Sequence, residues 1–299
     1  MSKFLRTVIV DARTMATEVK SFDLPINPLS FIKITLEGTA LTTIPTLTEI
    51  LAFINKVEIT HRGQSIISLD GEDLAALNLY LLGSRGFKIA DLYATSTYFS
   101  YSFFVPFGRR LYDENECYPG TRKGELQITL DTTIPATSFN VAVMSLEACE
   151  LPDASPSQYL KATQLNVSAP GATGIFDTQL PLGNELLAIL IGLAAFPTSG
   201  DVLYTVDDMR LLCDNVEHQF ASAKTPALIA DRMLRSSRDP DNPVLFTLGA
   251  PDYYLWMDFD PNRDSAFSVQ TSEFSEAKCR FNYGENAAIH VIPVEIVQV

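Results

Sequence analysis

The order of segments along this chain occurs twice, and this duplication constrains the fold more than any other feature. Residues 98–106 (YFSYSFFVP) resemble residues 253–261 (YYLWMDFDP), 155 positions later. The pair Phe22-Asp23 stands ahead of an apolar run, as Phe176-Asp177 does 154 positions later. Two further blocks match in pattern, residues 55–60 with 207–212 and residues 143–147 with 291–295. Because four blocks keep their order and nearly their spacing, we expect two tandem copies of one domain, in an architecture that uses both.

The composition suits two domains built mainly of strands. The chain has 299 residues, a length that suits two domains of about 150 residues each. Its hydrophobic content of 46% is enough for a buried core in each domain. Its net charge of −14, without any basic tract, argues against a nucleic-acid surface, which needs clustered Lys and Arg. Residues 1–20 lack an apolar core followed by a cleavage site, so we expect synthesis in the cytoplasm without secretion.

Hydrophobic periodicity predicts short strands and one short helix in each copy. Residues 31–37 and 57–63 alternate apolar and polar side chains, as half-buried strands do. Asp70 can cap a helix over residues 71–82, with Gly83 just past its end, and Thr225-Pro226 opens a helix to about residue 234. Further strands are predicted over residues 98–105, 125–130, 139–146, 186–191, 209–213, 253–259, 277–281 and 289–297.

Equivalent strands of a duplicated domain should bury equivalent faces, because side chains alternate with period two. Phe99, Tyr101 and Phe103 are expected to share the core face of the first copy. In the second copy, either Tyr254, Trp256 and Asp258 form that face, or the alternate residues Tyr253, Leu255, Met257 and Phe259 do. The acidic Asp258 favours the latter or an early end of the strand.

We therefore predict an all-β fold of two tandem eight-stranded jelly rolls, each with one short helix. The expected division is an N-terminal arm over residues 1–20, a first jelly roll over 21–150, a linker over 151–174 and a second jelly roll over 175–299. Residues 1–20 hold four Lys or Arg and two acidic residues, a net +2, against −16 for the rest of the chain. Such an arm could contact an anionic partner.

The sequence predicts no catalytic, cofactor-binding or metal-binding residues. The histidines His61, His218 and His290 are scattered, and no nucleophile or phosphate-binding motif occurs. Residues 258–264 (DFDPNRD) place oxygen ligands at alternate positions, as calcium prefers, but Arg263 stands where the loop needs glycine. An acidic strand end that turns into a loop is the favoured interpretation. The widely spaced Cys117, Cys149, Cys213 and Cys279 predict four free, structural thiols.

Several segments in succession resemble a known family. They are residues 22–25 (FDLP), 32–38 (IKITLEG), Ile54 with 56–66 (KVEITHRGQSI), 70–74 (DGEDL) and 103–109 (FFVPFGR). With the duplication, this order resembles the double jelly-roll major capsid proteins of tailless icosahedral viruses, especially small membrane-containing phages. The resemblance covers nearly the whole chain from about residue 20. The second copy departs from it at one turn, with Asp214-Asn215 where the first copy has Arg62-Gly63-Gln64.

The resemblance implies a structural protein and no enzymatic activity. Such chains form homotrimers in which six jelly rolls make a pseudo-hexagonal capsomer, and neighbouring capsomers tile an icosahedral virion shell. Penton and minor capsid proteins are the implied further partners, together with an internal lipid membrane that residues 1–20 could reach. Direct nucleic-acid binding is not expected.

Another class of function stays open at this point. A tandem jelly-roll module that binds carbohydrate or a receptor would show exposed aromatic and carboxylate side chains in one loop. The loop over residues 108–124 holds Tyr112 and Tyr118 beside Asp113, Glu114 and Glu116. A glycoside hydrolase, which needs two converging carboxylates, is a third possibility.

Overall fold

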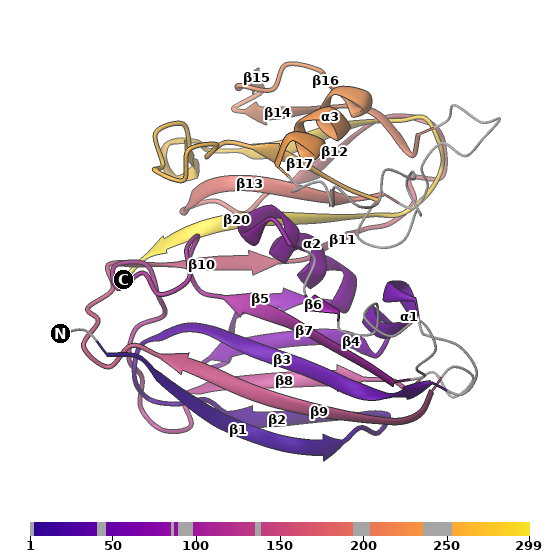
Figure 1. The fold of residues 1–299 in the computed structure, drawn as a ribbon. Coiled ribbons are helices and arrows are strands. Elements are labelled where there is room, and N and C mark those ends of the chain that lie inside the picture. The colour runs from indigo at the N-terminus through magenta and orange to yellow at the C-terminus, as the bar shows by residue number, and fades with distance from the viewer. Residues whose placement is uncertain are drawn as a thin grey trace. The chain divides into compact units, whose positions relative to one another are not determined.

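The computed structural model describes residues 3–40, 46–84, 87–88, 98–134, 139–193, 204–235 and 253–299. The chain divides into two compact units, the first of residues 1–163 with 298–299 and the second of residues 164–297. Each unit is described by itself (Figure 1). Among the described residues, no helix is long and apolar enough to cross a membrane.

Two sheets form the first unit. One has the strand order β1 (Leu5–Thr14), β9 (Phe139–Glu150), β3 (Leu29–Ala40), β7 (Tyr98–Pro106) and β6 (Phe87–Lys88). The other has the order β2 (Glu18–Asp23), β8 (Leu126–Thr132), β4 (Ile54–His61), β5 (Gln64–Leu69) and β10 (Gln158–Thr163), the last running parallel to β5. Strands β1 to β4 alternate between the two sheets, and so do β7, β8 and β9, which is the jelly-roll arrangement.

The second unit repeats this arrangement. One sheet joins β11 (Leu165–Val167), β20 (Ile289–Gln298), β13 (Glu185–Gly192) and β17 (Tyr254–Asp258), with β18 (Val269–Gln270) also on β13. The other joins β12 (Gly174–Gln179), β19 (Ala277–Tyr283) and β14 (Val206–Cys213), with β15 (Val216–Glu217) and β16 (Ala223–Lys224) on β14. The predicted fold, a mostly β double jelly roll, is confirmed.

Strands β7 and β17 occupy the same place in the two units, which confirms the correspondence expected from the sequence. In the first unit, β7 pairs with β3, and β3 pairs with β9. In the second, β17 pairs with β13, and β13 pairs with β20. Each of these strands follows the main helix of its unit, α2 (Gly71–Leu82) or α3 (Thr225–Arg235).

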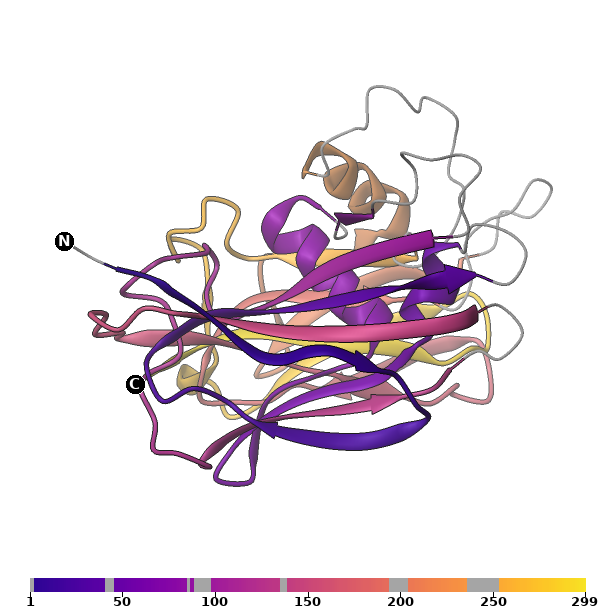
Figure 2. The same cartoon turned by 60° about the horizontal axis from the view of Figure 1, so that its bottom comes forward.

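The helix α2 has the limits that its capping residues predict. The Asp70 carboxylate accepts the backbone N–H of Asp73 at 2.8 Å, and Gly83 ends the helix in the left-handed conformation at φ 68°. The helix packs against β7, β4 and β5, and Figures 1 and 2 show it beside the strands of its unit. A further short helix, α1 (Leu47–Leu51), was not expected; its signal is the capping box of Thr46 and Glu49.

The side chains that face the core differ in position between β7 and β17. Phe99, Tyr101 and Phe103 are all buried on one face of β7, as predicted. In β17, the core cluster of the second unit takes Leu255 and Met257, followed by Phe259, so the second of the two predicted faces is correct. Tyr254 and Trp256 are buried too, on the opposite face of β17, the strand against which α3 packs.

Two segments expected to lie outside the jelly rolls contain strands. Residues 5–14, placed in an N-terminal arm, form β1 and pair with β9, and residues 18–23 form β2 on β8. The expected linker over residues 151–174 contains β10 and β11. These are edge strands or short strands, so they bury little and show weak periodicity in sequence. The domain limits at residues 21, 150 and 175 stay a prediction.

Candidate functional site: the exposed loops and sheet edges

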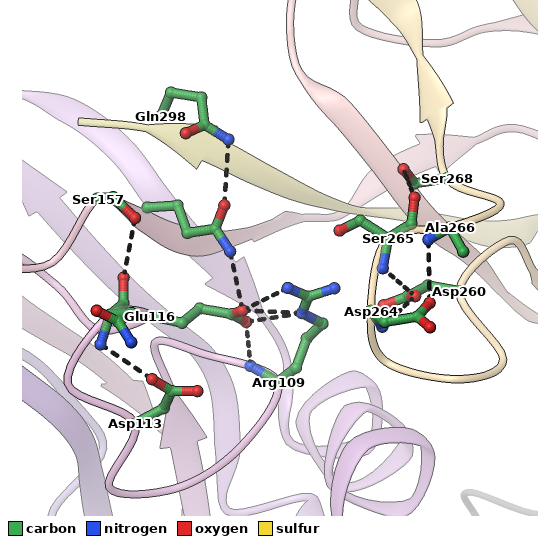
Figure 3. A network of polar contacts seen from close by, with 12 residues as sticks. Arg109, Asp113, Glu116, Ser157, Asp260, Asp264, Ser265, Ala266, Ser268 and Gln298 are labelled. Carbon is green, nitrogen blue, oxygen red and sulfur yellow. Dashed lines mark hydrogen bonds and ion pairs between the residues drawn. The ribbon is translucent and has the colours of Figure 1, made fainter.

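A buried ion pair organises the loop between β7 and β8. The Arg109 Nη2 atom lies 2.7 Å from Glu116 Oε2, and the Arg109 Nε–H donates to the same oxygen at 2.8 Å. The Arg109 backbone N–H donates to Glu116 Oε1 at 2.5 Å (Figure 3). Both side chains are more than nine-tenths buried. Gly108 is required here, because a Cβ would lie 2.2 Å from the Glu116 carbonyl oxygen. The loop is therefore internally fixed.

The same ion pair is joined to the end of the chain. The Gln158 Nε2–H donates to Glu116 Oε2 at 3.2 Å, and the Gln298 Nε2–H donates to Gln158 Oε1 at 3.2 Å (Figure 3). The Val299 N–H also donates to the Ser157 carbonyl at 2.9 Å. These bonds attach the last two residues to the first unit.

The expected sugar-binding group of this loop is not assembled. Tyr118 is buried, with its ring 4.8 Å from that of Tyr159 and edge-on to His61. The Glu116 carboxylate is buried in its ion pair with Arg109. Only Tyr112 stays exposed, at 42% of its surface, and its ring contacts Phe4. The carbohydrate-binding interpretation is therefore not supported.

The carboxylates of the acidic loop after β17 accept hydrogen bonds from backbone N–H groups of the same loop. Asp260 is fully buried, and its Oδ1 accepts the N–H groups of Asp264 and Ser265 at 3.0 and 2.8 Å. The Asp258 Oδ1 accepts the Asp260 N–H at 2.9 Å. The Asp264 Oδ1 accepts the Ala266 N–H at 3.0 Å (Figure 3). Arg263 takes a left-handed φ of 60° where a calcium loop has glycine. The arrangement is that of a strand end turning into a self-capped loop.

The histidines and cysteines occupy separate structural positions. His61 Nε2 lies 3.8 Å from Glu125, His218 packs edge-on against Phe274, and His290 pairs with Asn166 across β20 and β11. All four cysteines are free and buried. Burial raises the pKa of the Cys117 thiol to about 12 and also raises those of Cys149, Cys213 and Cys279. These thiols are therefore protonated and unreactive at neutral pH.

Exposed apolar side chains gather where the first strand begins. Phe4 and Leu5 are 57% and 48% exposed, and Val8 is 58% exposed. Leu5 and Val8 belong to β1, and Phe4 directly precedes it. Within the part of the chain that the structure describes, β1 pairs with β9 alone and so forms the outer strand of its sheet. Two of the basic residues predicted here are already paired. Arg6 contacts Glu147 at 3.4 Å and Tyr112, and Arg13 contacts Glu18 at 2.8 Å.

The outer strands of two other sheets repeat this feature. Val19 on β2 is 65% exposed, and Ile175 on β12 is 62% exposed. Both strands pair with one neighbour, β8 or β19, in a register without bulges. An exposed edge strand with an apolar side chain is a surface that a further protein surface can cover. The sequence carried no signal for this, because exposure of a strand edge depends on which neighbours the fold supplies.

Comparison with known proteins identifies the fold. No protein-family model and no curated protein matches the sequence. The crystal structure of the STIV MCP, the major capsid protein of Sulfolobus turreted icosahedral virus, matches with a TM-score of 0.72 at 12% identity, over 99% of this chain and 97% of that one. The major capsid protein of bacteriophage PM2 matches with a TM-score of 0.67 at 14% identity, over 100% and 98%.

A third structure, the quasi-atomic model of the PBCV-1 virus capsid, matches with a TM-score of 0.60 at 11% identity, over 99% of this chain and 94% of that one. These matches run along almost the full length of each chain. The protein therefore has the double jelly-roll fold of these capsid proteins, in agreement with the resemblance of its sequence segments.

Proposed function

We propose that this chain is a structural major capsid protein that forms homotrimers and builds an icosahedral virion shell. The observation that carries the proposal is the full-length match of both jelly rolls to major capsid proteins from several viruses. A single jelly roll occurs in proteins of many functions. A match to two jelly rolls in tandem, over the same total length, narrows the range of possible functions. Three such chains would supply the six similar walls of a pseudo-hexagonal capsomer.

The surface features support self-association. Val19 and Ile175 are exposed on corresponding outer strands of the two units, and Leu5 and Val8 on another. Assembly would remove these side chains from water, at about 25 cal/mol for each Å² of apolar surface. We expect obligate interfaces on the order of 2,000 Å² or more. The loops over residues 108–124 and 258–266, which were the candidates for sugar or calcium binding, are held by their own hydrogen bonds.

The remaining parts of the proposal follow from a shell role. The protein would act without catalysis, reside in the virion capsid after synthesis in the host cytoplasm, and contact penton and minor capsid proteins. Contact of residues 1–20 with an internal lipid membrane is a weaker part of it. Arg6 and Arg13 are engaged with Glu147 and Glu18, so fewer cations in this segment are available to lipid head groups.

Native mass spectrometry and electron microscopy of the purified protein test the proposal. We expect a trimer at micromolar concentration and particles with a six-lobed outline. The thermal stability of the protein should rise with its concentration if the trimer is obligate. A stable monomer at micromolar concentration, or a dimer without higher assembly, would contradict the proposal.

A further inference from the structure

One end of the first unit carries a cluster of exposed cations, here called the basic tip. It consists of the turn over residues 61–64, between β4 and β5, and residues 121–125, which lead into β8. The Arg62 N–H donates to the Glu125 carbonyl at 3.0 Å, and the Arg62 Nη2–H donates to Glu125 Oε1 at 2.9 Å. Arg62, Arg122 and Lys123 are exposed, with Glu125 as the one carboxylate of these residues. The basic tip has a net charge of +2 with His61 neutral.

The second unit has an acidic tip built in the same way. It consists of residues 213–218, the turn between β14 and β15, and residues 272–276, which lead into β19. The Asp214 N–H donates to the Glu276 carbonyl at 2.9 Å, and Asp214 Oδ1 accepts the Ser275 and Glu276 N–H groups at 2.9 and 3.0 Å. Asp214, Glu217 and Glu273 are exposed. These residues hold four carboxylates and no Lys or Arg.

The two tips are corresponding parts of the duplicated fold. The basic tip holds the turn after β4, and the acidic tip holds the turn after β14. In each turn, one backbone N–H donates to the carbonyl of the residue just before the paired strand, β8 or β19. Arg62 corresponds to Asp214, 152 positions later, and Glu125 corresponds to Glu276, 151 positions later. The backbone is repeated, and the charge of the exposed side chains is reversed.

Nearby groups reduce the negative charge of the acidic tip only in part. Arg210 on β14 pairs with Glu217 at 2.8 Å, and Lys278 on β19 pairs with Glu276 at 3.3 Å. Asp214 and Glu273 contribute further negative charge to this tip, and the second unit as a whole is acidic. Residues 164–297 hold 8 Lys or Arg against 18 Asp or Glu, whereas residues 1–163 hold 14 against 18. The second unit is thus the more acidic, at 8 − 18 = −10 against 14 − 18 = −4, and the basic tip is a positive site on a unit of negative net charge.

We propose that the basic tip of one copy of this chain docks against the acidic tip of a second copy. Opposite charges attract and like charges repel, so a contact between unlike tips is favoured over a contact between two basic or two acidic tips. The contact joins different surfaces of the two copies, which is the heterologous type that closes rings or extends lattices. Charge thus specifies which jelly roll neighbours which. This inference rests on the proposed self-assembly and specifies which surfaces of neighbouring copies meet.

A zero-length carbodiimide cross-linker tests the contact directly, because it joins a carboxylate only to an amine it touches. Isotopically heavy and light chains are mixed, assembled and cross-linked. We expect heavy–light peptides that join Lys123 to Glu273 or Glu217. Trimeric protein without such mixed cross-links would overturn the docking but leave the shell proposal intact. Wild-type protein that is monomeric and also yields none would contradict both.

Charge exchange supplies a second, independent test. One variant carries Arg122→Glu and Lys123→Glu, and another carries Glu217→Lys and Glu273→Lys. The first variant changes the basic tip from +2 to −2. With the neighbouring Arg210 and Lys278 counted, the second variant changes the acidic tip from −2 to +2. Each variant then has two tips of like sign, so its self-association should weaken roughly tenfold or more. Mixing the two variants, or combining all four substitutions in one chain, restores unlike pairs and should restore assembly. Circular dichroism should show that each variant is folded.

Matched controls separate the tips from overall charge. Lys56→Glu with Arg110→Glu gives the same change in net charge as the first variant, and Asp153→Lys with Asp231→Lys gives the same change as the second. All four positions are exposed and lie outside the tips. The controls should assemble like wild type. The proposal is overturned if the tip variants assemble no worse than the controls, or if mixing them restores nothing.

Discussion

At the scale of single residues, the Arg109–Glu116 pair explains how a loop without regular secondary structure keeps one conformation. Three donor groups, two from the guanidinium of Arg109 and one from its backbone, converge on the two oxygens of one carboxylate. Gln158 supplies a further bond to Glu116. Buried charges of this kind are tolerated only when they are paired and hydrogen-bonded, so each partner depends on the other.

Replacing Glu116 by alanine should therefore destabilise the protein strongly. The change leaves the Arg109 cation buried without its partner, which typically costs about 3–5 kcal/mol. Chemical denaturation measures the loss. Glu114→Ala, a half-exposed position in the same loop, is the control and should change stability by no more than about 0.5 kcal/mol. A loss below 1 kcal/mol for Glu116→Ala would show that the pair does not hold the loop.

At the scale of elements, each main helix contacts the backbone of the strand that follows it. From α2, the Asn78 Nδ2–H donates to the Phe104 carbonyl at 2.6 Å, and Asn78 Oδ1 accepts the Phe104 N–H at 2.9 Å. From α3, the Arg232 Nη1–H donates to the Tyr254 carbonyl at 3.1 Å. The helices thus supply hydrogen bonds to β7 and β17.

Asn78→Ala should loosen the α2–β7 contact. Both Phe104 backbone groups lose their hydrogen bonds to Asn78, at about 1–3 kcal/mol for each buried bond removed. Asn55→Ala, an exposed position whose amide bonds Asp131 and Thr133, is the control and should cost about 1 kcal/mol or less. Hydrogen exchange should speed up in β7 for Asn78→Ala only. Unchanged exchange of the Phe104 amide would contradict this role.

The outer face of the sheet of β12, β19 and β14 should make stability depend on pH. Arg280 holds the Asp177 carboxylate with bonds of 2.6 and 2.8 Å, which lowers the pKa of Asp177 below its usual range. A lowered pKa contributes stability above the unfolded value of about 3.9, and this contribution is lost as pH falls further. Urea unfolding should show Asp177→Asn less stable than wild type at pH 7, with the gap closing below about pH 4. A gap that stays constant down to pH 3 would refute the assignment.

At the scale of the whole molecule, the cysteines report on each unit separately. Cys117 and Cys149 are buried in the first unit, and Cys213 and Cys279 in the second. Because burial raises all four thiol pKa values, native protein should not react with a thiol reagent at pH 7.5. In denaturant, labelling followed by peptide mapping should show each pair reacting as its unit unfolds. Rapid labelling of any of the four without denaturant would contradict the burial.

Much of the fold could be predicted because its signals are local. The caps at Asp70 and Gly83 define α2, and alternating side chains define strands such as β7 and β8. The duplicated order of segments indicates two copies of one jelly roll. All these signals act between residues close in sequence or through a simple period, so the sequence by itself determined the strand content, the main helices and the tandem architecture.

Only the tertiary structure decided which faces and edges are covered. Strand β13 is buried at all of its positions and β17 at nearly all, so neither shows the alternation that marks a face. Strand β1 has no buried position, and the sequence predicts a mildly basic arm there. The charge reversal between the two tips is recognised only from the structure, which shows that Arg62 and Asp214 are corresponding residues. Burial and neighbourhood depend on contacts between residues far apart in sequence, which no local period encodes.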